Sequence, residues 1–257
     1  PPLRPYIDRY WGWEGFACLP QSVLPGTGAE CLFHYAEPFI LNQQAAPCAT
    51  LLSPRSRPIA IAASGRIGFV AVRFRSGRLR HLCSRPLADL HDHAWPVETI
   101  WGDAAARLCD ALGDATDKAT RVEALDAFFR KQLARHQDSS SGAFDTLLDQ
   151  LYYAPCTSVE HLAAQSGWTR RHFLRKFTKY YGLSPKRFAR IARLSHTMRL
   201  LALDPAATSL DAALRIGNST AFPEASLRPL SIVNRDFPQG FPLRPAKVEQ
   251  KSPPIHA

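Results

Sequence analysis

The spacing of apolar residues changes once along the chain, near Pro86, and this change constrains the fold more than any other feature. From Leu19 to about Arg75, short apolar runs such as residues 30–35 and 67–74 alternate with glycine, proline and serine turns, a pattern typical of β-strands. After Pro86, apolar residues recur every three or four positions, which indicates amphipathic helices. We therefore predict an α+β fold in which a strand-rich, barrel-like N-terminal domain is followed by trailing helices.

Composition excludes several classes of protein. The chain has 257 residues, of which 46% are hydrophobic, and this is enough apolar material to close a core and to exclude disorder as the main state. It has no run of about 18 uncharged apolar residues and no apolar segment behind a basic start at residues 1–5. We therefore expect a soluble, cytoplasmic protein without membrane spans or a secretion signal.

The cysteines and histidines form no specific metal motif. The six cysteines include no Cys-x-x-Cys pair, so we expect neither a disulfide framework nor a tetrahedral zinc site, and we interpret them as buried thiols. Another group of residues could bind a metal ion, but its sequence is equally typical of a polar loop. These residues are Cys83, Asp89, His91, Asp92 and His93. The chain also lacks a glycine-rich phosphate loop and a paired-carboxylate signature. We expect no metal, no other cofactor and no catalytic residues.

The positive charge is concentrated in one segment. The net charge is +10, and residues 156–199 contain ten Lys or Arg residues against one acidic residue, Glu160, so this segment carries most of the excess. A balanced N-terminal part joined to such a basic module is typical of a sensor or scaffold attached to a polyanion binder. A solvated basic face would have the same composition, so charge alone leaves both interpretations open.

The start of the basic module has the pattern of two helices joined by a tight turn. A short helix begins with a hydroxyl cap at Thr157 or Ser158. Gly167 then supplies the left-handed conformation that a sharp turn needs. A second helix follows, with Thr169 as its cap and its end at about Tyr181. This order predicts a helix-turn-helix arrangement.

The second helix has one face for packing and one for an anion. At about 100° per residue, Phe173 and Phe177 point one way and the cations cover the other side. An α-helix is narrow enough to fit the DNA major groove. There, Arg171 and Arg175 could each bind a guanine, and Leu174 could contact a thymine methyl group. The competing interpretation of each cation is a surface charge that improves solubility. The candidate DNA-binding residues are Thr169, Arg170, Arg171, His172, Leu174, Arg175, Lys176 and Lys179.

A third helix completes a recognisable order of motifs. Ser184 caps it, Pro185 occupies its first turn, and its apolar stripe continues to Leu201. The segment from Ser158 to Leu203, which includes LAAQSGWTRRHFLRKFTKYYGLSPKRFARIARL, resembles the first half of the DNA-binding domain of AraC/XylS-type transcription regulators. The resemblance implies a sequence-specific regulator whose two helix-turn-helix units enter successive major grooves of double-stranded DNA, with RNA polymerase as a further partner.

The N-terminal part resembles the uncharacterised sensor domain of one branch of that family. The resemblance lies in LRPYIDRYWGWE (Leu3–Glu14), VLPGTGAECLFH (Val23–His34) and GFVAVRFRSGRLRHLC (Gly68–Cys83). It implies a sensor but names no ligand. Polar residues of the strand-like segments could converge in a pocket for a small-molecule effector, or could lie at strand ends and on the surface. The candidate ligand-binding residues are Trp11, Glu30, His34, Arg73 and Arg75.

The resemblance ends after Gly217. Residues 208–217 fit the first helix of a second unit, with a capping hydroxyl before an acidic first turn. Residues 218–257 contain seven of the chain's 21 prolines, and a proline inside a helix costs about 3 kcal/mol. We therefore expect no intact second recognition helix in this segment. A shifted reading frame and an independent extension both remain open. We expect the monomer to bind DNA weakly and with a strong salt dependence. A homodimer would restore tighter binding because it supplies a second reading helix.

These patterns divide the chain into four parts. We expect an α+β sensor-like domain over residues 1–136, a linker and connecting helix over 137–155, an all-α helix-turn-helix domain with an incomplete second half over 156–217, and an irregular Pro-rich tail over 218–257. Two other interpretations stay open. One is an enzyme that the basic module localises to nucleic acid, and the other is an interaction protein that dimerises through helices within residues 104–153.

Overall fold

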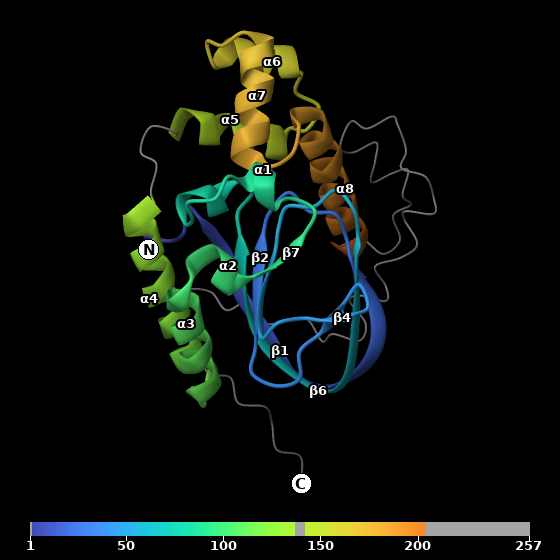
Figure 1. Cartoon of the computed structure of the whole chain (residues 1–257). Helices are drawn as coiled ribbons and strands as arrows, with labels where there is room; N and C mark the ends of the chain where they lie inside the picture. Colours follow the sequence, from blue (N-terminus) through green and yellow to red (C-terminus); the bar gives the residue numbers. More distant parts are fainter. Residues whose placement is uncertain (1, 137–141, 204–257) are drawn as a thin grey trace.

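The computed structural model describes residues 2–136 and 142–203, which form two units that pack against each other (Figure 1). The first unit is a curved antiparallel sheet with helices on one face, and the second contains only helices. The predicted α+β class, with a strand-rich N-terminal part followed by helices, is confirmed. In the part of the chain that the structure describes, no helix is long and apolar enough to cross a bilayer. The predictions for residues 204–257 lie outside the described residues.

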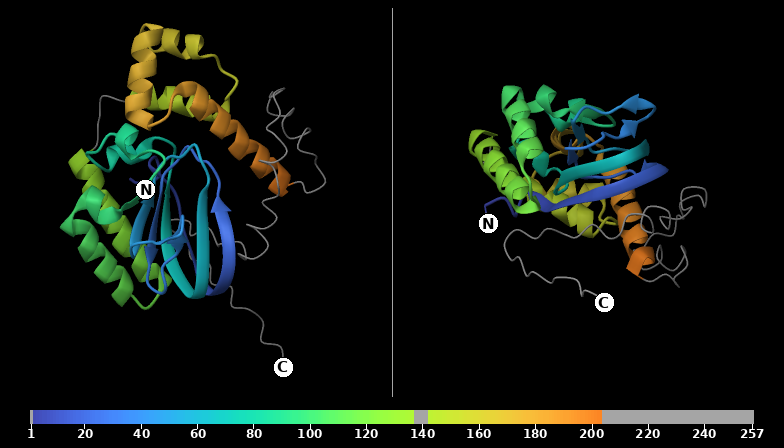
Figure 2. Two further views of the ribbon diagram at one scale, coloured as in Figure 1. Left: turned by 45° about the vertical axis from the view of Figure 1, so that its right-hand side comes forward. Right: turned by 90° about the horizontal axis from the view of Figure 1, so that it is seen from below.

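Two long strands form the frame of the sheet. Strand β1 (Ile7–Val23) pairs with β6 (Ile59–Phe74) along its whole length, and the far edge of β6 pairs with two different strands in turn. Because β6 changes partners along its length, the sheet curls, as Figure 2 shows. The strands are joined in the order β4-β3-β6-β2-β5-β7. The shorter ones are β2 (Glu30–His34), β3 (Ile40–Leu41), β4 (Gln44–Ala45), β5 (Ala49–Leu52) and β7 (Ala94–Pro96).

The two faces of the sheet bury different sets of side chains. Along β2, Cys31 and Phe33 belong to the core under the helices, whereas Leu32 belongs to a second apolar cluster on the other face. This alternation follows from the two-residue period of a strand. The helices that cover the first face are α2 (Val97–Trp101), α3 (Asp103–Asp114) and α4 (Lys118–His136).

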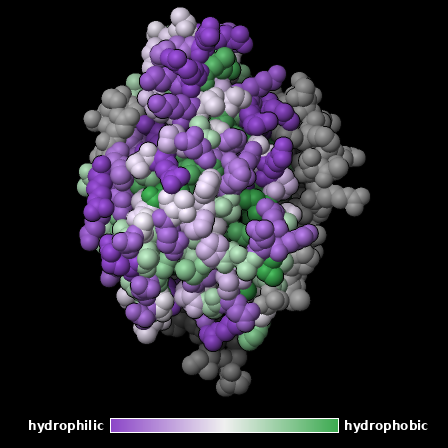
Figure 3. Space-filling model, viewed as in Figure 1, coloured by the Kyte–Doolittle hydropathy of each residue, from purple (hydrophilic) through white to green (hydrophobic). Residues whose placement is uncertain are grey.

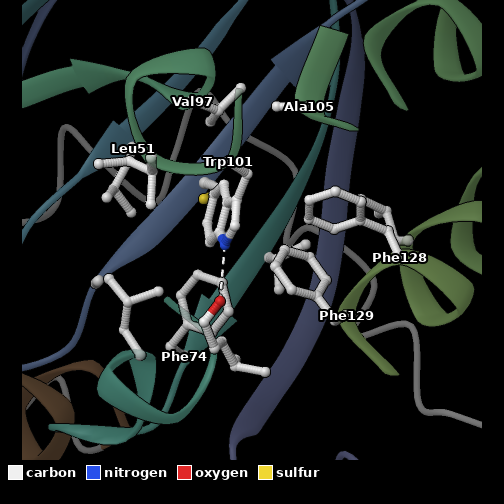
Figure 4. Packing of buried hydrophobic residues seen from close by; sticks show 14 of the residues in the cluster. Leu51, Phe74, Val97, Trp101, Ala105, Phe128 and Phe129 are labelled. Atoms are coloured by element: carbon white, nitrogen blue, oxygen red, sulfur yellow. Dashed lines mark hydrogen bonds between the residues drawn. The ribbon is translucent and has the colours of Figure 1, made fainter. Parts of the chain in front are cut away.

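Trp101 lies at the centre of the core between the sheet and these helices (Figure 4). Its ring meets Phe128 and Phe129 edge-on, with ring centroids 5.6 and 5.7 Å apart. Its indole Nε1 donates a hydrogen bond to the Leu82 carbonyl oxygen (2.7 Å), which satisfies the one polar group that the tryptophan buries. Large aromatic side chains therefore fix how the helices sit on the sheet.

The second unit is built around a cluster of aromatic rings. The Phe144 and Tyr181 rings are stacked with centroids 5.4 Å apart, and the Tyr181 hydroxyl donates to the Phe144 carbonyl oxygen (3.0 Å). Phe173, Phe177 and Phe188 complete the fully buried centre. The helices are α5 (Gly142–Tyr153), α6 (Val159–Gln165), α7 (Arg170–Tyr181) and α8 (Pro185–Leu203). Helix α5 thus shares its core with α6, α7 and α8.

A buried ion network joins the two units. Asp145 of α5 pairs with Arg78, with Arg80 (2.7 Å) and with the His81 Nε2 (2.8 Å), all in the short helix η1 (Arg78–His81) that follows the sheet. The arginine side chains are less than one-tenth exposed. Gly77, at φ +72°, precedes η1, and a Cβ there would clash with Tyr181. Helix α1 (Leu87–Leu90) also lies against α7.

Some local expectations were wrong. The sheet begins at Ile7, twelve residues before the first strand that the apolar pattern predicts at Leu19. Among the thiols, Cys31 and Cys83 are buried as expected, but Cys48 and Cys156 are exposed. The glycine- and serine-containing linker at 137–141 lies outside the described residues. The domain boundaries drawn from the sequence remain proposals.

Replacing Asp145 with Asn tests the interface network. We expect Asp145→Asn to destabilise the protein by about 3 kcal/mol, because it leaves two nearly buried guanidinium groups with less compensating charge. Urea denaturation would measure the loss. Asp110→Asn, which changes an exposed acid on α3, is the matched control. An equal effect of the two substitutions would contradict a special role for Asp145.

The same network predicts acid sensitivity. Burial alone would raise the pKa of Asp145, but hydrogen bonds from His81 and Arg80 outweigh it and lower the pKa below its usual value. The folded-state pKa is therefore below the unfolded-state pKa, which is near 4 for an aspartate. The stabilisation is present above about pH 4 and is lost as the pH falls through the lowered pKa. Asp145→Asn should remove this part of the pH dependence.

Candidate nucleic-acid interface

The turn between α6 and α7 is set by two capping hydroxyls and one glycine. The Ser158 Oγ accepts a backbone N–H from the first turn of α6 (3.1 Å). Gly167 has a φ of +69°, which lets the chain reverse between the helices. The Thr169 Oγ1 accepts the backbone N–H of His172 (3.3 Å) and begins α7. The two predicted helices and the left-handed Gly167 are confirmed.

Helix α7 separates apolar and cationic side chains as its sequence predicts. Phe173 and Phe177 are fully buried in the core of the helical unit. Arg171, Arg175 and Lys179 are exposed on the other side. Figure 3 shows hydrophilic residues over much of the lobe that α6 and α7 form. This face can therefore contact an anion without moving a core side chain.

Other candidate residues near the start of α7 have partners within the protein. The Arg170 Nε lies 3.0 Å from the Glu160 Oε1 in an exposed ion pair. The His172 ring packs edge-on against the Trp168 ring, with centroids 4.9 Å apart. Thr169 is the helix cap. These residues shape the turn, and their side chains are only partly available to an external anion.

Leu174 and Lys176 lie at the sides of the exposed face. Leu174 is half-buried and lines a cleft of about 390 Å³ between α7, α8 and the residues before α6. The Lys176 Nζ lies 3.5 Å from the Tyr180 hydroxyl and 5.4 Å from the centre of that ring. Among the candidate residues, Arg171, Arg175 and Lys179 are therefore the cations that are exposed and form no ion pair within the described residues.

Some cations of α8 lie near the junction of the two units. Arg187 and Arg190 line a cleft of about 270 Å³ together with Ser56 and Arg57 of the strand-rich unit. The Arg193 Nη1 donates to the Pro155 carbonyl oxygen (3.1 Å). Arg193 is thus held by a contact within the chain, whereas Arg187 and Arg190 are exposed beside the cleft.

Three of the five candidate ligand-binding residues meet on the sheet face away from the helices. The Trp11 indole Nε1 donates to the Glu30 Oε1 (2.7 Å), and the Arg73 Nη1 lies 3.6 Å from the other carboxylate oxygen. Glu30 is buried, and these two contacts compensate its charge at close range. Sequence reasoning missed Arg55, a buried arginine near Glu30. Burial lowers the pKa of Arg55 to about 10, and no local sequence signal marks this position.

His34 is close to that group but Arg75 is not. The rings of Trp11 and His34 both pack against Phe69, at centroid distances of 5.0 and 5.9 Å. Burial lowers the pKa of His34 to about 4, and its ring nitrogens have no hydrogen-bond partner within the described residues. The Arg75 Nε instead donates to the Arg4 carbonyl oxygen (3.0 Å). Neither cleft described above is lined by these residues.

The possible metal ligands near Asp92 take part in a local loop. Asp92 has a φ of +61°, and its carboxylate accepts hydrogen bonds from the backbone and hydroxyl of Ser56. The His91 Nε2 lies 3.7 Å from the Asp92 carboxylate. The His93 Nδ1 is bonded to the His91 carbonyl oxygen (2.8 Å). This arrangement corresponds to the polar-loop interpretation of the sequence.

Comparison with known proteins gives one partial family match. Residues 1–96 match a family described as a domain of unknown function, DUF6597. No curated protein matches the chain. The structure is similar to ToxT from Vibrio cholerae, at 13% identity and a TM-score of 0.44 over 84% of this chain and 91% of the other. It is also similar to unsaturated-fatty-acid-bound ToxT from strain SCE256, at 10% identity and 0.44 over 84% and 88%. Likeness at this level assigns no ligand or activity.

Gly167→Ala tests the turn that positions α7. A Cβ at this position meets open space, so the expected loss is the backbone strain of a left-handed alanine, about 1–2 kcal/mol. Gly113→Ala is the matched control, because Gly113 lies in α3 with open space around it and no positive φ. That substitution should stabilise the protein by about 0.4–1 kcal/mol. Chemical denaturation would measure the free energy of unfolding of both variants. If both substitutions changed it in the same direction, the left-handed conformation of Gly167 would not explain the effect.

His34→Phe tests the buried histidine. The folded-state pKa of about 4 lies below the ordinary value of about 6.5, so the unfolded state binds the proton more readily. The free energy of unfolding should have its full value above about pH 6.5. It should fall by up to about 3 kcal/mol as the pH drops to 4. His34→Phe should flatten this fall in urea denaturation. His161→Gln, at an exposed histidine, is the control, and a fall unchanged by His34→Phe would exclude His34 as its source.

Proposed function

We propose that the chain is a sequence-specific, DNA-binding transcription regulator of the AraC/XylS type in which α7 enters the major groove. The observation that carries this proposal is the face of α7 that exposes Arg171, Arg175 and Lys179 opposite the buried Phe173 and Phe177. The capped turn fixes this face relative to the core of the unit. A rigid helix that presents cations outward has the form that major-groove binding needs.

Each exposed residue has a distinct proposed role. Arg171 and Arg175 are four residues apart, so both point into one groove, where each guanidinium can bind a guanine through two hydrogen bonds. Lys179 lies nearer the end of α7 and is placed for a phosphate contact. The backbone N–H groups and positive dipole at the start of α7, beside Thr169 and Arg170, favour a second phosphate.

The strand-rich unit is proposed to sense or to dimerise. The buried group of Trp11, Glu30 and Arg73, with His34 nearby, supplies polar partners for a small-molecule effector. Alternatively, the unit holds two copies together so that two reading helices bind one site. RNA polymerase is a further proposed partner because of the family resemblance. Because the sequence predicts no second reading helix after Gly217, monomer binding should be weak and salt-dependent.

Substitution of the two central arginines tests the reading role. Binding sites are first selected from random duplexes with the full chain, and affinity is then measured by fluorescence anisotropy. We expect Arg171→Ala and Arg175→Ala each to lose about 1–3 kcal/mol on the selected site and to relax its sequence preference. If both variants keep the preference of the parent, α7 is not the reading helix.

A second series separates base contacts from phosphate contacts. Lys179→Ala should weaken binding to all sequences alike and reduce the slope of log affinity against log salt by about 1. Arg107→Ala is the control, because it removes one exposed cation from α3 in the strand-rich unit. If Arg107→Ala matches Lys179→Ala, the affinity arises from net charge alone.

A further inference from the structure

Two thiols and a carboxylate from three separate elements converge in the strand-rich unit. Cys48 precedes β5, Glu98 lies on α2 and Cys109 lies on α3. One ligand atom of each lies within 4.8 Å of the other two, and the Cys109 Sγ is 3.8 Å from the Glu98 Oε1. Cys48 is exposed and the other two are half-buried, so the group is open to solvent on one side.

The charge around this group favours a cation. Within residues 2–136 and 142–203, no Lys or Arg forms an ion pair with Glu98. The carboxylate therefore stands beside two sulfur ligands without a positive partner among the described residues. Sulfur and carboxylate ligands together suit a thiophilic divalent ion, whereas Mg²⁺ and Ca²⁺ prefer oxygen ligands alone.

We propose that Cys48, Glu98 and Cys109 bind a divalent cation of the zinc class, with a solvent molecule as the fourth ligand. In a tetrahedral site with Zn–S bonds of about 2.3 Å and Zn–O bonds of about 2.1 Å, the ligand atoms are about 3.5–3.8 Å apart. The observed separations approach these values, so small side-chain rotations complete the site. The exposed side beside Cys48 accommodates the fourth ligand.

A disulfide between Cys48 and Cys109 is the competing use of the same atoms. Its formation is a two-electron oxidation that needs an external oxidant, and it would leave the Glu98 carboxylate beside Cys109 without a cation. A divalent cation is instead stabilised by the carboxylate and both sulfur atoms together. The cation is therefore the occupant that all three side chains favour.

This inference goes beyond the proposed DNA binding and does not depend on it. A bound cation would connect the segment before β5 to α2 and α3, and these helices cover the main core of the sheet. Glu98 lies 50 residues after Cys48 and 11 residues before Cys109, so the three ligands have no Cys-x-x-Cys spacing in the sequence. The sequence-based expectation of no metal rested on that spacing.

Cobalt titration of the reduced, metal-free full chain tests the site. We expect one Co²⁺ per chain, with the sulfur-to-cobalt charge-transfer band and visible spectrum of a tetrahedral thiolate site, and displacement by Zn²⁺. Cys48→Ser and Cys109→Ser should remove the charge-transfer band. Glu98→Gln should weaken Co²⁺ binding at least about 10- to 100-fold, because loss of a partner outside the ligand shell already has an effect of that size. Cys156→Ser, at an exposed cysteine of the helical unit, should bind as the parent does.

The same measurements can overturn the proposal. Unchanged cobalt spectra in Cys48→Ser and Glu98→Gln would place any bound cation elsewhere. Failure of the reduced parent chain to bind Co²⁺ or Zn²⁺ would exclude the site, and a Cys48–Cys109 disulfide in the purified protein would then identify the competing use. If Cys109→Ser fails to fold by circular dichroism, Cys48→Ser decides the question, because Cys48 is exposed.

Discussion

The position of α7 depends on the buried ion pairs around Asp145. One carboxylate on α5 pairs with Arg78, Arg80 and His81 from the end of the sheet, so the two units share a single charge network. Removing such charges from water is unfavourable unless they are paired, and in this docking geometry Asp145 meets all three basic side chains. In the observed orientation of the helical unit, the ion pairs and the stacked Phe144 and Tyr181 rings therefore lie side by side at one junction.

The residues of this interface also form the core that supports α7. Phe144, next to Asp145, stacks on Tyr181 at the end of α7, and the Arg80 guanidinium lies 5.2 Å from the Tyr180 ring. The C-terminal end of α7 is thus fixed against the strand-rich unit, while its earlier turns point outward. Arg73, in the polar group of the sheet, lies only five residues before the start of η1.

The sequence predicts features that depend on neighbouring residues and misses those that depend on distant ones. The caps, the Gly167 turn and the opposed faces of α7 follow from spacings of a few residues, so the pattern alone is sufficient for them. The start of β1 is not predicted because Gly12 and Gly15 interrupt its strand pattern, and pairing with β6 decides its conformation. The Asp145 network joins positions more than sixty residues apart, and no local pattern records that contact.

Net charge overstates the surface that α7 and α8 can offer to DNA. Arg170 pairs with Glu160, Arg193 binds a backbone carbonyl, and Arg187 and Arg190 face the strand-rich unit. Among these contacts, only the Arg170–Glu160 pair offsets a positive charge, and Arg187 and Arg190 stay exposed beside the cleft. In the proposed binding mode, the salt dependence follows the number of phosphates that are neutralised. The cations aimed at the groove in that mode are the exposed group Arg171, Arg175 and Lys179 of α7. The geometry of that group, rather than the total charge of the chain, therefore carries the functional argument.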